Sequence, residues 1–149
     1  MKTVYNELKI IGIIHSPFKT VKECPRQGLE TISEIEIFKE YEEGLTDIQD
    51  FTHLHVFYWL HKSEGYKLMV DTPWDTRPHG VFTTRSPHHP NPLAYSVATL
   101  LERRDNILRV TGLEAIEGTP VIDIKPYIKK LDLRNDAISG WSENIDFKF

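Results

Sequence analysis

Gly80–Ser96, GVFTTRSPHHPNPLAYS, is the stretch from which the rest of the chain can be interpreted. Its first residues, up to Arg85, are typical of a short strand. Three prolines follow, and each pushes the residue before it (Ser86, His89 or Asn91) into an extended conformation. A loop that is already stiff loses little freedom on binding. Because it also holds a cation, two imidazoles, hydroxyls and an amide, we interpret it as part of a small-molecule site; the alternative is a rigid connection between two barrel strands.

Short strand patterns lie on both sides of this loop. Tyr95–Arg103 and Ile107–Thr111 are separated by Arg104-Asp105-Asn106, which predicts a hairpin because Asp and Asn tolerate left-handed turn positions. The other predicted elements are a buried strand over Leu8–His15, a strand with one wet face over Ser33–Phe38, a short helix or turn over Tyr41–Phe51, a central aromatic strand over Thr52–His61, and a last strand over Pro120–Ile124. No helix longer than about ten residues is expected. We therefore predict a mainly β fold, a barrel or sandwich with short helical segments.

The length and net charge of the chain limit the classes of function that it can have. The 149 residues, 40% of them hydrophobic, predict one globular domain over residues 1–149. The 18 basic and 22 acidic residues give a net charge of −4, which argues against a protein that grips a nucleic-acid backbone over its whole surface. A local basic patch stays possible. No internal repeat or low-complexity segment is visible.

The compartment is predicted from what the chain lacks. Its one cysteine, Cys24, cannot form an internal disulfide, which fits a reducing environment. The N-terminus has no signal-peptide pattern, and no run approaches the roughly 18 apolar residues that span a bilayer. We expect a cytoplasmic protein with no membrane partner.

The sequence gives only weak signals for a metal site, a cysteine nucleophile or a dinucleotide-binding loop. His53-x-His55 places two imidazoles on one face of a strand, but no further ligands stand at a zinc spacing, so no metal is expected. Cys24 as a nucleophile needs a base that the sequence does not place, and a loop or partly buried thiol is favoured. The eight glycines never stand two apart, which excludes G-x-G-x-x-G and argues against a Rossmann fold.

Glu117–Tyr127, EGTPVIDIKPY, is the second informative stretch. Gly118 permits a sharp turn, and Thr119 offers a hydroxyl and a backbone amide. We predict that Val121, Ile122 and Ile124 point inward, with Asp123 and Lys125 outward. The alternative is a surface hairpin with a solvated Asp–Lys pair.

Four motifs, in order, resemble the TsaA-like (YaeB-like) family: IGIIHSPF (Ile11–Phe18), PRQG (Pro25–Gly28), GVFTTRSPHHPNP (Gly80–Pro92) and EGTPVIDIKPY (Glu117–Tyr127). The resemblance covers about residues 8–130 and leaves the tail, 132–149, outside. It implies a single-domain β-barrel, S-adenosylmethionine as methyl donor, and a homodimer with the cofactor near the subunit interface. It also implies methylation of N6 of threonylcarbamoyl-adenosine at position 37 of tRNA.

The resemblance also implies a set of cofactor-binding residues: Gln27, Gly28, His61, Lys62, Arg85, Tyr95, Glu117, Gly118, Thr119 and Pro120. The chain departs from the family pattern at four positions. His89 stands for an arginine, Ala94 for a glycine, Tyr95 for leucine or methionine, and Glu117 for aspartate. The lost arginine is a residue type that holds phosphate or carboxylate, so the fold and cofactor transfer more safely than the substrate.

The sequence does not decide which residue acts as the base or which molecule accepts the methyl group. Asp123, His88 and His89 are the candidate bases for removing the N6 proton. Asn91, Lys125 and Tyr127 are candidate substrate contacts. Methylation of a small molecule and non-catalytic binding of S-adenosylmethionine are the alternatives to tRNA methylation.

The tail gives a separate reason to expect a homodimer. Trp141, Phe147 and Phe149 stand in an otherwise polar segment, and we expect these rings to lie against the domain or a partner chain.

Overall fold

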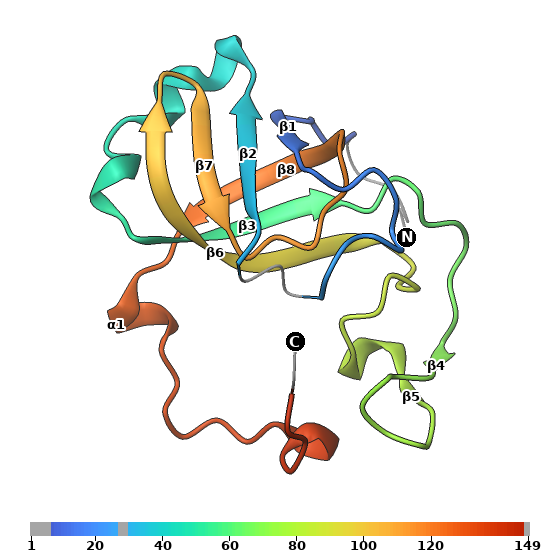
Figure 1. Cartoon of the computed structure of the whole chain (residues 1–149). Coiled ribbons are helices and arrows are strands. Elements are labelled where there is room, and N and C mark those ends of the chain that lie inside the picture. The colour runs from blue at the N-terminus through green and yellow to red at the C-terminus, as the bar shows by residue number, and fades with distance from the viewer. Residues whose placement is uncertain (1–6, 27–29, 148–149) are drawn as a thin grey trace.

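The structure is a computed structural model that describes residues 7–26 and 30–147 (Figure 1). Six strands close into a barrel in the order β1-β2-β7-β6-β3-β8, and every pairing is antiparallel. These strands are β1 (Gly12–His15), β2 (Ile32–Ile37), β3 (His53–Trp59), β6 (Leu93–Arg104), β7 (Ile107–Thr111) and β8 (Thr119–Pro126). The predicted mainly β barrel is confirmed.

The remaining elements are short. Three-residue and seven-residue 3-10 helices, one α-helical turn and a two-stranded hairpin account for them: η1 (Lys39–Leu45), η2 (Ile48–Asp50), β4 (Met69–Val70), β5 (His79–Gly80), η3 (Val81–Thr83), α1 (Lys129–Asp132) and η4 (Gly140–Ser142). In the described part of the chain no helix is both long and apolar enough to span a membrane.

The core lies inside the barrel because alternate residues of each strand point inward. In β2 the inward residues are Ser33, Ile35 and Ile37, which confirms the predicted strand with one wet face. They meet Leu54 and Val56 of β3 and similar residues of the other strands, nearly all fully buried. Complete burial of aliphatic side chains of this size stabilises a fold by about 1.5 to 3 kcal/mol each.

The strand β6 is long enough to serve two neighbours. Residues 93–99 pair with β3, and residues 99–104 pair with β7. In Figure 1 this strand accordingly curves around the barrel wall. The turn to β7 has Asp105 at a φ of +52°, which confirms the predicted hairpin.

The structure differs from the predicted strands at the first strand and at Gly80–Arg85. The first strand begins at Gly12, not at Leu8, because only residues from Ile11 onward bond to the neighbouring strands; Leu8 is 63% exposed. The predicted strand from Gly80 to Arg85 does not form, because Gly80 ends β5 and Val81–Thr83 form η3. Here the hydroxyls of Thr83 and Thr84 donate to carbonyls three residues earlier, and such local bonds compete with strand pairing.

A bulge changes the predicted alternation of β8. Phe57 pairs with Asp123, while Tyr58 pairs with Val121, so Ile122 is the extra residue. Ile122 is half-buried and outside the core cluster, so the prediction that it packs inward was wrong, whereas Val121 belongs to the core and Ile124 packs against it. Asp123 and Lys125 face outward as predicted, and their side chains form an ion pair at 3.0 Å.

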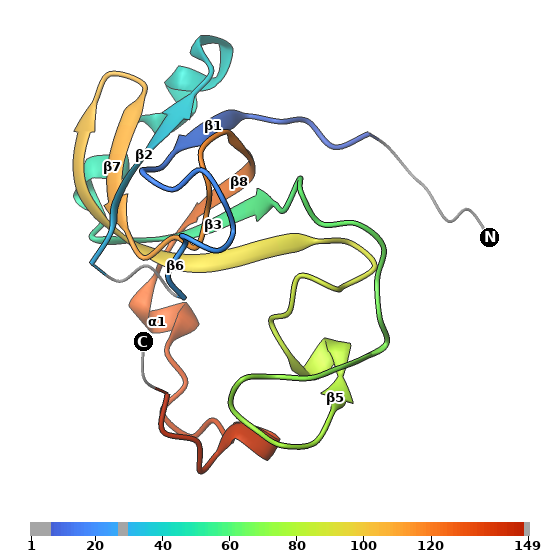
Figure 2. The same cartoon turned by 45° about the vertical axis from the view of Figure 1, so that its right-hand side comes forward.

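The C-terminal tail returns to the chain instead of leaving it. After α1 it runs below the barrel to the segment that contains β4 and β5 (Figures 1 and 2). Trp141 stacks on His79 with 3.9 Å between ring centroids, and Phe147 packs edge-on against Trp74 at 5.0 Å. Two of the three tail rings therefore have intrachain contacts, and Phe149 lies outside the described residues.

Candidate functional site

The strand register gathers several loops at one end of the barrel. Tyr58 pairs with Ala94 on one side and Val121 on the other, so the residues after β3, before β6 and before β8 share this end. The turn after β3 contacts the proline loop, since the Ser63 hydroxyl donates to the Pro87 carbonyl at 2.9 Å. The predicted cofactor residues His61 and Lys62 belong to this turn and are exposed.

A pocket of about 820 Å³ opens among these loops, a volume typical of ligand sites. It lies between the barrel end, the proline loop and the C-terminal tail. Its lining comprises Arg26, residues 71–74, residues 82–88, Glu114, Trp141, Ser142 and Phe147.

Arg85 contributes an exposed guanidinium to this pocket. Its Cζ atom lies 5.5 Å from the centre of the Tyr95 ring, and no carboxylate among residues 7–26 and 30–147 forms an ion pair with it. Tyr95 is itself held in place by Nδ1 of His55, 2.8 Å from its hydroxyl, while Nε2 of His55 donates to Asp132 at 3.0 Å. The structure thus places Arg85 and Tyr95 together, with the cation available for a ligand.

A second cation and a carboxylate come from the other loops. The Arg26 guanidinium lies over the Trp74 ring at 5.4 Å. Glu114 is exposed, and its backbone N–H donates to the hydroxyl of Tyr58 at 3.2 Å. Burial raises the pKa of Tyr58 to about 12, so this phenol stays protonated and also bonds to Ser96 at 2.8 Å. A core side chain therefore fixes the loop that brings Glu114 to the pocket.

The two histidines of the proline loop have different surroundings. His88 lines the pocket. His89 does not; its Nε2–H donates to the Thr84 carbonyl at 3.0 Å, and its ring meets Phe82 edge-on at 5.8 Å. The His89 side chain thus stabilises the loop from within, and of the two only His88 faces the pocket.

The predicted Glu117–Pro120 segment is at this end of the barrel but not in the pocket lining. Glu117 accepts from the Ser16 backbone at 2.9 Å and bonds to Nδ1 of His15 at 2.7 Å. Gly118, at a φ of +84°, donates its N–H to Ile14, and the buried Thr119 hydroxyl donates to Ile116. Pro120 pairs with Ile13 in β1.

This network shifts two pKa values. The hydrogen bond to Glu117 raises the pKa of His15, burial opposes that rise, and Glu36 at 3.1 Å adds to it. The same bond to His15 lowers the pKa of Glu117. In this structure the segment therefore joins the β7–β8 loop to β1.

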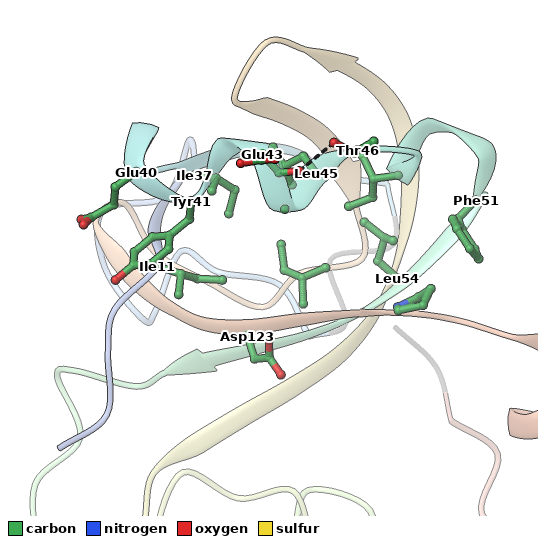
Figure 3. A pocket seen from close by; sticks show the side chains of 14 residues that line it. Ile11, Ile37, Glu40, Tyr41, Glu43, Leu45, Thr46, Phe51, Leu54 and Asp123 are labelled. Carbon is green, nitrogen blue, oxygen red and sulfur yellow. Dashed lines mark hydrogen bonds between the residues drawn. The ribbon is translucent and has the colours of Figure 1, made fainter. Parts of the chain in front are cut away.

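Other predicted residues lie elsewhere. Lys125 and Asp123 are on the outer face of β8, where Tyr127 packs against His55 at 5.3 Å. Asp123 borders a different hollow, about 680 Å³, beneath η1 (Figure 3). In Figure 3 its carboxylate points away from Leu45 and Thr46.

The predicted set also includes Asn91, Gln27 and Gly28. Asn91 is exposed at the entry to β6, and its carbonyl accepts from Leu93. Gln27 and Gly28 lie outside the described residues, directly after Arg26. Within the described ranges, no three His, Cys, Asp or Glu side chains gather as a metal site would require. His55 contacts Tyr95 and Asp132 instead.

Sequence reasoning missed several lining residues. Trp74, Glu114 and Asp71 stand in segments without periodicity or a recognisable motif. Trp141 was noticed only as a ring in a polar tail, and that signal was sound because the ring packs on the pocket wall.

Comparison with known proteins decides the family. Residues 13–133 match the family described as the tRNA-methyltransferase O N-terminal domain. The chain belongs to this family. The predicted resemblance to TsaA-like proteins is thereby confirmed, and the barrel shown in Figure 1 is the tRNA-methyltransferase O N-terminal domain.

Individual relatives extend this result. A probable S-adenosyl-L-methionine-binding protein of Archaeoglobus fulgidus is 50% identical over 143 residues, covering 94% of this chain and 39% of that protein. The tRNA (adenine(37)-N6)-methyltransferase of Escherichia coli is 32% identical over 147 residues, covering 90% and 63%. The crystal structure of TrmO from Pseudomonas aeruginosa superimposes with a TM-score of 0.80 at 27% identity, covering 97% and 66%. The chain thus spans between 39% and 66% of the length of these relatives.

The pocket's chemistry fits the cofactor that the relatives' names indicate. S-adenosylmethionine has an α-carboxylate, a positively charged amine and sulfonium, ribose hydroxyls and a purine. Arg26 and Arg85 suit the carboxylate, Asp71 and Glu114 suit the amine or the hydroxyls, and Trp74 and Trp141 suit the purine. The residues present therefore match the group in charge and in aromatic surface.

Proposed function

We propose that this chain methylates N6 of adenosine 37 in tRNA, with S-adenosylmethionine as the donor. The observation that supports this most is the pocket at the barrel end, where Arg85 is held on Tyr95 without an ion pair among the described residues. Family membership supports the reaction class. The E. coli relative's name supplies the acceptor position.

Binding would use the groups already in place. Arg85 would hold the donor's carboxylate through paired hydrogen bonds, which a planar guanidinium provides. When bound, S-adenosylmethionine supplies an electrophilic methyl group on a sulfonium. Alignment of that group with the acceptor nitrogen accounts for much of the acceleration in such displacements, and the internally bonded proline loop preserves such an alignment.

His88 is the base that we propose for the N6 proton. It is the only one of the three predicted bases that lines the pocket with Arg85 in the described structure. Nε2 of His89 is occupied by the Thr84 carbonyl, and Asp123 pairs with Lys125 on another face. A His88→Gln variant is expected to bind the donor normally while turnover falls by about 100-fold or more.

The specific nucleoside that we propose as methyl acceptor at position 37 is threonylcarbamoyl-adenosine. Its carboxylate needs a cation, and the pocket has two guanidiniums, Arg26 and Arg85, one more than the donor's carboxylate requires. The second guanidinium is important because His89 replaces the arginine usual in TsaA-like proteins, and a histidine is only partly charged at neutral pH.

Non-catalytic binding of S-adenosylmethionine is the second candidate, because the A. fulgidus relative is named only for binding. One experiment separates the two functions. The purified chain is incubated with labelled donor and tRNA carrying either adenosine or threonylcarbamoyl-adenosine at position 37, and the nucleosides are analysed by mass spectrometry. Methylation only of the modified tRNA is expected. Donor binding without methylation of either tRNA would support the binding function instead.

A further inference from the structure

One wall of the pocket lies outside the residues that match the family. The family match ends at residue 133, whereas Trp141, Ser142 and Phe147 of the tail line the pocket. None of them belongs to the cofactor residues implied by the resemblance. We call residues 134–147 the C-terminal strap.

Trp141 is fixed on the pocket wall by three contacts. Its indole stacks on the His79 ring with an interplanar angle of 15°. Its Nε1–H lies 3.1 Å from the Thr83 carbonyl and 3.2 Å from the Thr83 hydroxyl. The ring therefore has one occupied face and an anchored edge, and its remaining surface is what it offers to the pocket.

The support under Trp141 is itself rigid. His79 is 5% exposed, and its Nε2–H donates to Asp75 at 2.7 Å. The hairpin of β4 and β5 holds His79 opposite Val70, which is also buried. The indole thus rests on a preformed base, which reduces the ordering cost of stacking a ligand on it.

The pocket's remaining walls favour a flat, polar-edged ligand. Phe82 and Trp74 add two aromatic rings, while Arg26, Arg85 and Asp71 supply charges of both signs. A purine has flat faces that stack on aromatic rings and edges that accept and donate hydrogen bonds. A purely apolar ligand would leave these charges without partners.

We propose that Trp141 is a binding residue of this pocket, which stacks the purine ring of an adenosine. The inference rests on the proposed function, because both the donor and the acceptor of that reaction carry adenine. Either adenine can supply the ring, and the two sources differ in which ligand loses affinity when Trp141 is changed.

The test uses three full-length variants. Trp141→Leu removes the aromatic ring but keeps apolar volume, and Trp141→Phe keeps a stacking ring. Ile138→Ala is the control, since Ile138 lies in the same strap and is 85% exposed. Thermal melting checks each fold.

Binding of two probes is then measured by calorimetry or fluorescence anisotropy. The probes are S-adenosylhomocysteine and an anticodon stem-loop RNA with threonylcarbamoyl-adenosine at position 37, with uridine at 37 as the RNA control. Trp141→Leu should weaken one probe by about 5- to 100-fold, the range for losing one base–aromatic stack, while Trp141→Phe and Ile138→Ala stay near the parent.

The outcomes are distinct. A loss confined to S-adenosylhomocysteine assigns the stack to the donor, and a loss confined to the modified RNA assigns it to the acceptor. A folded Trp141→Leu variant that binds both probes like the parent overturns the inference. A parent chain that binds neither probe contradicts the proposed function itself.

Discussion

Arg85 is the residue on which the assignment of the pocket most depends. Arg85→Ala should leave the fold intact and weaken donor or acceptor binding by about 10- to 100-fold, because a charge-assisted hydrogen bond contributes about 1.5 to 3 kcal/mol. Arg85→Lys should recover only part of this, since an ammonium cannot form two parallel bonds.

Donor titration and thermal melting measure these two effects. Arg104→Ala is the matched control, since Arg104 pairs with Glu102 on the exposed β6–β7 hairpin. If both Arg85 variants bind and turn over like the parent, Arg85 is a surface residue, and the site is elsewhere.

The bond between His15 and Glu117 predicts a pH-dependent contribution to stability. His15 has a raised pKa, so its share is complete below its ordinary value of 6.5 and is lost as pH rises through the raised value. Glu117 has a lowered pKa, so its share is complete above its ordinary value of 4.5 and is lost as pH falls. The window of greatest stabilisation lies between 4.5 and 6.5.

Glu117→Gln should therefore lower the Tm by about 1 to 3 °C near pH 5.5, because exposed pairs contribute under about 1 kcal/mol, and by less near pH 8.5. Melting curves of parent and variant at both pH values measure the difference. A Tm difference that grows with pH would show that the bond does not contribute in this way.

Residue patterns were most informative where local chemistry decides the structure. The Asp105 turn and the alternation of Ser33, Ile35 and Ile37 were predictable because each depends on neighbouring residues alone. The pocket was not. Glu114 reaches it only because the Tyr58 hydroxyl holds its loop, and Trp141 only because His79 lies beneath it, 62 residues earlier in the chain.

At the level of elements, β1 and β2 approach each other closely at Gly12. A Cβ atom there would overlap the Glu36 carbonyl oxygen, which belongs to the backbone and cannot move without disturbing the β1–β2 pairing. Gly12→Ala should cost about 1 to 3 kcal/mol of unfolding free energy in a urea titration. Gly44→Ala is the control, because nothing lies within 4 Å of its added Cβ. Equal stability of the two variants would contradict the close approach.

The link from β3 to the β7–β8 loop predicts an effect of the core on the pocket. Tyr58→Phe removes the hydroxyl that bonds to the Glu114 N–H and to the Ser96 hydroxyl, which should cost about 1 to 3 kcal/mol. Donor binding should weaken as well, since Glu114 lines the pocket.

Tyr66→Phe is the matched control for this change, as Tyr66 is 61% exposed. Unfolding titrations and donor calorimetry of both variants provide the two readings. Loss of stability with unchanged donor affinity would separate the loop from the site.

For the whole molecule, we propose that the chain forms a homodimer. The tail rings Trp141 and Phe147, on which the sequence-based expectation of a dimer rested, contact other rings of the same chain. The outer face of β6, however, exposes Leu93, Val97 and Leu101 at 44%, 39% and 49%. Exposed apolar side chains along one face of a strand are the kind of surface that a partner covers. Sedimentation equilibrium should give twice the chain mass for the parent and for Ile138→Asp, and a monomer for Val97→Asp combined with Leu101→Asp. A monomeric parent at micromolar concentration would rule the dimer out.

Closure of the six strands also restricts how the molecule can associate. Each strand of the barrel has a hydrogen-bonded neighbour on both sides, so free backbone donors and acceptors are confined to stretches that pair on one side alone, such as residues 93–98 of β6, which pair with β3. Free strand edges are the templates on which sheets grow into aggregates or recruit extended peptides. In the described chain the remaining sheet, β4 with β5, has strands of two residues each. An RNA or protein that binds elsewhere on the barrel must therefore recognise side chains and loops, and fibril growth from the native barrel must start at such a short stretch or wait until the barrel opens.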